Sequence, residues 1–235
     1  MQGVNLALTS QDLFYDYELA KMILKNKLGA RYAIIGVSPF SLNYDLSQGV
    51  NSDRAFAYYP ITKTLHNHHF RAEILPELFN DTYIKSYDLF TAELKFDGCL
   101  RSCTQNRDFN LNDFIDVRKK LLEQKEHLQT VAENKKILQS YVKDCLKADV
   151  LPLLVIYPVS EFYNKYFSAR KFEELRYFLT DLSTKFKVPF LDFAADNNFT
   201  LADFFDVEHL NSRGAKKFSG ILNAKLLEQE NKKSR

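Results

Sequence analysis

The apolar run VLPLLVIY at 150–157 constrains the fold of this chain more than any other segment. A strand that is apolar on both of its faces is typical of a parallel sheet covered by helices on both sides. Two shorter apolar runs, at 32–37 and 188–193, also have the composition of strands. The sequence therefore predicts an α/β fold in which a mainly parallel sheet lies between helices.

Helical periodicity predicts helices between and around these strands. The expected helices are a first one that starts after the capping segment 9–12, a long one from about 112 to 145 with a break near 134, one at 172–186, and a last one capped by Ser212. No repeat and no low-complexity linker divides the sequence. We therefore expect a single domain, 1–235, with a long insertion at about 40–110 that follows no clear period.

Composition and charge narrow the class of partner. The chain of 235 residues is 46% hydrophobic and 26% charged, which is ordinary for a globular protein. Its 32 basic and 30 acidic residues give a net charge of +2, which indicates neither nucleic acid nor a membrane surface as a partner. No apolar run reaches about 18 residues, and the first residues do not follow the pattern of a signal peptide. Cys99, Cys103 and Cys145 are expected to be free thiols.

The segment DVEHLNSRGA at 206–215 carries the clearest chemical pattern. Asp206 and His209 have a spacing that brings two side chains together where the backbone turns. A carboxylate beside an imidazole fixes its tautomer and stabilises the imidazolium that forms when the ring accepts a proton. An isolated Asp-x-x-His is more often the exposed start of a helix. A strand before this pair and a helix after it favour a general base instead.

This segment resembles the final block of the SGNH (GDSL-like) hydrolase superfamily, which includes esterases, acyltransferases and the DltD-like proteins of the bacterial envelope. The segments VNLALTS at 4–10 and IIGVSP at 34–39 are similar to the strands that carry the second and third blocks of that family. The resemblance implies a flavodoxin-like, three-layer α/β/α fold. It also implies a serine acyl-ester hydrolase or O-acyltransferase, with Asp206 and His209 as the general base.

The same resemblance implies a class of partner and a location in the cell. The expected partner is an acylated carbohydrate of the cell envelope or a small acyl ester, and the expected location is the cell envelope. No cofactor and no metal ion is expected.

The strand order of the family, 2-1-3-4-5, leaves one strand without a counterpart. Counted back from Asp206, the runs 188–193, 150–157, 32–37 and 4–8 match strands five, four, three and two. The first strand of the family pattern, which ends at the nucleophilic serine, is then missing. It is expected before residue 1, together with any membrane anchor. The alternative hypothesis is therefore a truncated or degenerate, catalytically inactive module that binds a glycan or a protein.

Ser10 has two functional interpretations. In the alignment above, its backbone N–H takes the place of an oxyanion donor in the second block of the family. If the run 4–8 is strand one instead, Ser10 lies where that strand meets a helix and is the nucleophile that faces His209. The simplest alternative is that Thr9 and Ser10 only cap the first helix.

Four further residues are candidates for substrate binding. Gly36, Ser38 and Asn43 lie in or after the segment that is similar to the third block, and Asn211 lies within the last block. The aromatic residues after the run 150–157, where a substrate groove can lie, are Tyr157, Phe162 and Tyr163.

Other ionisable residues are predicted to be structural. His66, His68 and His69 are close neighbours that point in different directions, so we expect a polar loop instead of a metal site. Asp203 and Glu208 are expected to be charges at the start of a helix.

Overall fold

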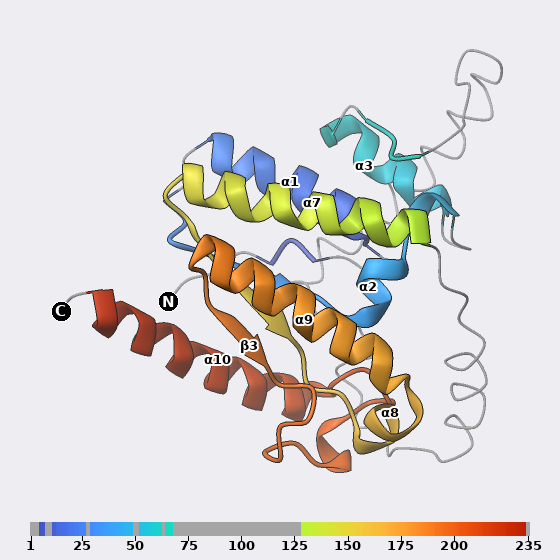
Figure 1. Cartoon of the computed structure of the whole chain (residues 1–235), viewed down its shortest axis with the longest axis vertical. Helices are drawn as coiled ribbons and strands as arrows, with labels where there is room; N and C mark the ends of the chain where they lie inside the picture. Colours follow the sequence, from blue (N-terminus) through green and yellow to red (C-terminus); the bar gives the residue numbers. More distant parts are fainter. Residues whose placement is uncertain are drawn as a thin grey trace.

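The computed structural model describes residues 5–7, 11–26, 29–48, 52–62, 64–67 and 128–233. Within them, three strands form a parallel sheet in the spatial order β1-β2-β3. The strands are β1 (Tyr32–Gly36), β2 (Leu151–Ile156) and β3 (Phe190–Asp192). All three lie in the predicted apolar runs, and the predicted α/β class is confirmed (Figure 1).

Helices connect and cover these strands. The longer helices are α1 (Leu13–Lys25), α7 (Leu128–Lys147), α9 (Ala169–Phe186) and α10 (Ser212–Lys233). The shorter helices are α2 (Pro39–Asn43), α3 (Ala55–Thr62) and α8 (Glu161–Tyr166), and the 3₁₀ turns are Leu46–Gln48, Ser52–Arg54 and Leu201–Asp203. None of the helices in the described part of the chain is both long and apolar enough to cross a membrane.

β2 is the most deeply buried strand because its side chains are covered on both faces of the sheet. Leu154 and Ile156 pack in the main core with residues of α1, α7 and α9, which lie together on one side of the strands (Figure 1). Leu153 and Val155 point to the opposite face and pack against the apolar side of α10. Coverage from both sides explains why this run is apolar at nearly every position.

α7 is continuous, so the predicted break near Asn134 is wrong. The side chain of Asn134 is buried, and its amide lies 2.9–3.2 Å from three backbone oxygens, those of Ser41, Leu42 and Tyr44. These carbonyls are at the end of α2, where a helix leaves its last oxygens without internal partners. The part of the predicted long helix before Leu128 lies outside the described residues.

The predicted strand at 4–8 is wrong for residues 5–7, the part of it that the structure describes. The side-chain oxygen of Asn5 accepts the backbone N–H of Ala7 at 3.0 Å, a local contact that competes with pairing in a sheet. Leu6 packs instead against a second, smaller core formed by α1, α3 and the turn at Leu46–Gln48. Leu46, Ala55 and Tyr58, which belong to the predicted insertion, pack in this second core with Tyr15 and Leu19 of α1.

Cys145 is a buried free thiol, as predicted. Burial raises the pKa of this thiol to about 12, which keeps it protonated and unreactive at neutral pH. Cys99 and Cys103 lie outside the described residues.

Candidate active site

The segment between β3 and α10 forms a closed loop that carries Asp206 and His209. Phe204 and Leu210 form an isolated antiparallel bridge at its base. The backbone N–H of Phe205 donates to the carbonyl oxygen of His209 at 2.7 Å. Since these contacts close the loop through its backbone, they fix the positions from which both side chains project.

The loop is attached to the segment that follows β2. Val207 is buried, and its carbonyl oxygen accepts the backbone N–H of Ser160 at 3.1 Å. Ser160 is the cap of α8, the helix that comes directly after β2. The loop therefore lies beyond the carboxyl ends of the strands, the edge at which parallel α/β sheets carry their ligand sites.

Asp206 and His209 are in direct contact. His209 Nδ1 is 2.9 Å from both carboxylate oxygens of Asp206. Asp206 Oδ1 also accepts the backbone N–H groups of Glu208 and His209, at 2.8 and 2.7 Å. The contact that the spacing in the sequence predicts is present, and two further donors hold the carboxylate in place.

The two groups shift each other's pKa values. Burial of Asp206 opposes its ionisation, but the hydrogen bond and charge of His209, together with the backbone N–H groups, lower the pKa of this carboxyl overall. The hydrogen bond to Asp206 is the main cause that raises the pKa of His209, against the effect of partial burial. The pair thus combines an ionised carboxylate with a strengthened base.

The second ring nitrogen of His209 is accessible. The side chain of His209 is 63% exposed, and no described residue forms a hydrogen bond with its Nε2. When Nδ1 donates to Asp206, Nε2 of the neutral ring has a free lone pair. It can therefore accept a proton from a hydroxyl group that approaches from the solvent.

A buried carboxylate supports the loop from the side of α10. Asp203 lies in the first turn of its 3₁₀ helix, as predicted, but it is also fully buried, with Lys217 Nζ at 2.6 Å and Arg213 Nε at 3.2 Å. Burial opposes its ionisation, but the hydrogen bonds from Lys217 and from the backbone of Thr200, with the nearby charges, lower the pKa of Asp203. Because both cations belong to α10, these ion pairs tie the helix to the loop.

Asn211 builds the start of α10. Its Oδ1 accepts the backbone N–H of Gly214 at 3.0 Å, so Asn211, and not Ser212 as predicted, caps the helix. Its side-chain amide donates to the carbonyl oxygens of Ala202 and Phe204, at 2.7 and 3.2 Å. The residue is buried and its contacts are internal, which argues against the substrate-binding role predicted for it.

Gly36, at the end of β1, is covered by the ring of Tyr157. A side chain at position 36 would overlap this ring, which also packs edge-on against Phe218 of α10 with 5.4 Å between the ring centroids. Glycine is therefore needed here for packing. Tyr157 is 44% exposed and offers an aromatic surface beside the strand ends, whereas Tyr163 is buried and Phe162 packs against the main core.

The functional roles predicted for Ser38, Asn43 and Ser10 stay predictions. Ser38 caps α2: its Oγ accepts the backbone N–H of Ser41 at 3.1 Å, and Ser41 Oγ accepts that of Ser38 at 3.2 Å. Asn43 is the last residue of α2. Ser10 lies outside the described residues, so its position relative to His209 is not defined.

His66 lies in a loop with polar contacts, as predicted, but the loop is buried at this residue. Its side chain is only 7% exposed, and Nδ1 faces the buried carboxylates of Asp12 and Asp45. The cause is long-range, since the start of α1 and the segment after α2 close over a residue that follows α3. His68 and His69 lie outside the described residues.

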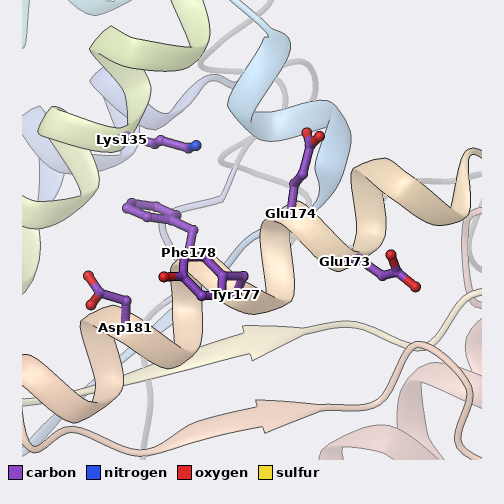
Figure 2. A pocket seen from close by; sticks show the side chains of 6 residues that line it. All are labelled: Lys135, Glu173, Glu174, Tyr177, Phe178 and Asp181. Atoms are coloured by element: carbon purple, nitrogen blue, oxygen red, sulfur yellow. The ribbon is translucent and has the colours of Figure 1, made fainter.

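A surface groove between α7 and α9 shares no residue with the loop of His209. It has a volume of about 410 Å³ and is lined by Lys135, Glu173, Glu174, Tyr177, Phe178 and Asp181. Figure 2 shows Lys135 projecting from α7 and the other side chains from α9. The ammonium group of Lys135 lies 5.2 Å from the centre of the Phe178 ring. The groove is therefore separate from the site formed by Asp206 and His209.

Comparison with known proteins adds no relative from which a function could be transferred. No family model, no curated protein and no solved structure matches this chain. The fold and the site thus define an α/β protein with an exposed aspartate–histidine pair on a backbone-anchored loop.

Proposed function

We propose that this chain is an SGNH-like serine acyl-ester hydrolase or O-acyltransferase in which Asp206 and His209 form the general base. The observation that carries the proposal is the 2.9 Å contact between Asp206 and His209 Nδ1 on a ring that is 63% exposed. Acyl transfer through serine needs an imidazole that is oriented on one nitrogen and accessible on the other. The position of the loop beyond the strand ends supports the proposal.

In the proposed reaction, His209 Nε2 accepts the proton of a serine hydroxyl as the serine oxygen attacks the acyl carbonyl. Asp206 remains ionised and stabilises the imidazolium. The imidazolium then gives its proton to the oxygen of the leaving alcohol. Water or a sugar hydroxyl, deprotonated by the same ring, then attacks the acyl carbon of the acyl-serine. The bond to the serine oxygen breaks, the imidazolium returns its proton to this oxygen, and the acyl group leaves as the free acid or as the ester of the sugar.

The proposed substrate is an acyl ester of a cell-envelope carbohydrate. The resemblance of the last block to envelope proteins suggests this class. The exposed ring of Tyr157 supports it, because ligand sites commonly combine aromatic surfaces with a few polar groups. Tyr157 and Ser160, which anchors the loop, both follow β2.

Covalent labelling of the active serine tests the proposal and, in the same experiment, identifies the nucleophile. The full chain would be incubated with a fluorophosphonate probe, digested and analysed by mass spectrometry, and hydrolysis of p-nitrophenyl acetate would be measured in parallel. We expect one labelled serine and a loss of about 10²- to 10⁴-fold in hydrolysis for His209→Ala. His127→Ala is the matched histidine control, since this histidine lies next to Lys125 and Glu126 in the sequence, far from the segment 206–215. A label on Ser10 that is absent in Ser10→Ala would make Ser10 the nucleophile.

The alternative is an inactive module that binds a glycan or a protein. One observation favours it: no described residue places a serine hydroxyl within hydrogen-bond distance of His209. This alternative predicts no labelled serine and the same hydrolysis by the wild type and by His209→Ala. That result would overturn the proposed enzyme.

A further inference from the structure

A second group of ionisable side chains lies buried beside α1 and shares no residue with the loop of His209. It consists of Asp12, Asp45 and His66, which are 2%, 5% and 7% exposed. One nitrogen or oxygen atom from each residue lies within 4.8 Å of the other two. The three residues come from separate segments: the start of α1, the connection after α2 and the residues after α3.

His66 Nδ1 is buried and has no hydrogen-bond partner. It lies 3.8 Å from Asp12 Oδ2 and 3.7 Å from Asp45 Oδ1, which is too far for a hydrogen bond. Ligand atoms around a tetrahedral ion, each about 2.1 Å from it, are roughly 3.4 Å apart. The two distances from His66 Nδ1 are therefore close to those between ligands around one ion.

Contacts on the other side of the ring orient His66. Its Nε2 is 3.2 Å from Glu133 Oε1. Asn67 Nδ2 is also 3.2 Å from Nε2, but it is closer to Asp45 Oδ2 and Glu133 Oε2, at 3.0 and 2.9 Å, and an amide has only two hydrogens to donate. When Nε2 carries the hydrogen of the neutral ring, the carboxylate of Glu133 lies close enough to accept it, and the Nδ1 lone pair faces the aspartates. A carboxylate on the far nitrogen is the usual partner of a metal-binding histidine.

Backbone hydrogen bonds orient both aspartates. Asp12 Oδ1 accepts the N–H of Tyr15 at 3.0 Å as the cap of α1, and Asp12 Oδ2 accepts the N–H of Leu46 at 2.9 Å. Asp45 Oδ1 accepts both the N–H and the hydroxyl group of Ser47, at 2.9 and 2.5 Å. Asp12 Oδ2 thus has one donor and keeps a second lone pair for another partner, whereas Asp45 Oδ1 has a free lone pair once the Ser47 hydroxyl rotates away.

The charge of the cluster favours a cation. The carboxylates of Asp12, Asp45 and Glu133 each have an oxygen within 3.8 Å of a ring nitrogen of His66. A divalent ion would neutralise part of the negative charge that these carboxylates concentrate here.

We propose that Asp12 Oδ2, Asp45 Oδ1 and His66 Nδ1 bind one divalent transition-metal ion, such as Zn²⁺. Two carboxylate oxygens and one imidazole nitrogen are a donor set for ions of intermediate softness. The ion joins the start of α1 to the segments after α2 and after α3, so the site is structural. It is independent of the proposed acyl transfer.

Isothermal titration of the full chain, treated with a chelator and dialysed, tests the proposal with Zn²⁺ and, separately, with Mn²⁺. We expect one ion per chain and an affinity about 100-fold weaker in Asp45→Asn and in His66→Gln. Glu133→Gln removes the carboxylate that holds Nε2 and should weaken binding by about 10- to 100-fold. Asp206→Asn removes the carboxylate of the exposed pair and is the matched control, with unchanged affinity.

Two variants keep the test decisive if a ligand variant fails to fold. Glu133 is 42% exposed, so Glu133→Gln is expected to fold. Asp12→Asn keeps an oxygen for the cap of α1 and leaves all five histidines in place, so it separates the cluster from adventitious binding by histidines. The proposal is overturned if the wild type binds neither ion, or if Asp12→Asn binds as tightly as the wild type.

Discussion

The two aspartate–histidine groups in the described part of the chain are held through opposite nitrogens of the imidazole ring. In the exposed pair, Asp206 contacts His209 Nδ1 and leaves Nε2 accessible. In the buried group, Glu133 contacts His66 Nε2, and Nδ1 faces two aspartates. The side chain of His209 is 63% exposed and that of His66 is 7% exposed.

This difference separates two kinds of chemistry. A ring with one oriented nitrogen and one accessible nitrogen can exchange a proton with a substrate. A buried ring surrounded by carboxylates has no such access, and its surroundings favour a bound cation. Residue type alone therefore does not define either site; the orientation and the exposure of the ring do.

The largest effect that we expect is on catalysis by the exposed pair. Asp206→Asn should lower kcat/KM for ester hydrolysis by about 10²- to 10⁴-fold. In the wild type, activity should rise with pH and pass its midpoint above 6.5, because the raised pKa belongs to the base that must lose its proton. In the variant the midpoint should move to lower pH, since the main cause of the raised pKa is gone. A pH profile of kcat/KM measures both effects, and an unmoved midpoint would contradict the role of Asp206.

The next effect concerns the ion pair beneath the exposed pair. Lys217→Met should lower the free energy of unfolding by about 3 kcal/mol, because it leaves the buried carboxylate of Asp203 without its closest cation. Lys225→Met is the control on the same helix. It removes an exposed pair with Glu228 and should cost less than about 1 kcal/mol. Urea unfolding measures both values, and equal losses would contradict the structural role of Asp203.

The same ion pair predicts a dependence on pH. The pKa of Asp203 is lowered in the folded chain, so its contribution to stability is present above the pKa of the unfolded state, about 3.9, and is lost as pH falls through the folded value. In Lys217→Met the folded pKa should rise, which reduces this contribution. Urea unfolding of both proteins between pH 7 and pH 3 should show the wild type losing more of its stability in acid, and parallel curves would contradict it.

A smaller effect is expected at the start of α10. A side chain at Gly214 would overlap the backbone oxygen of Asp203, whereas nothing lies within 4 Å of a side chain added at Gly220. Gly214→Ala should therefore lower the free energy of unfolding by about 1–3 kcal/mol. Gly220→Ala should raise it by up to about 1 kcal/mol, because alanine favours a helix over glycine. Thermal unfolding compares the two, and a stabilised Gly214→Ala would show that the loop does not pack closely on the helix.

Local patterns in the sequence predicted the parts of the molecule that depend on neighbours along the chain. The apolar runs at 32–37, 150–157 and 188–193 mark the strands because burial on two faces requires apolar residues at nearly every position. The contact between Asp206 and His209 was predictable for the same reason, since three residues of a turning backbone bring them together.

Contacts between distant segments could not be predicted in this way. His66 is buried by segments that begin 54 and 21 residues earlier in the chain, at Asp12 and Asp45. Asn134 lies inside a continuous helix, where its amide binds carbonyls at the end of α2, and the local pattern does not reveal this distant contact. The strand expected at 4–8 failed because Asn5 forms a local turn contact that the apolar pattern does not reveal.

The central claim is that a carboxylate contacts His209 at Nδ1 and His66 at Nε2. It can be tested by ¹⁵N NMR of the histidine side chains, with the signals assigned from the variants His66→Gln and His209→Gln. Above its pKa, His209 should carry its hydrogen on Nδ1. On addition of Zn²⁺, the Nδ1 signal of His66 should shift while Nε2 keeps its hydrogen, and the signals of His209 should not move. A hydrogen on Nε2 of neutral His209, or a Zn²⁺-dependent shift of His209 with His66 unchanged, would contradict the account.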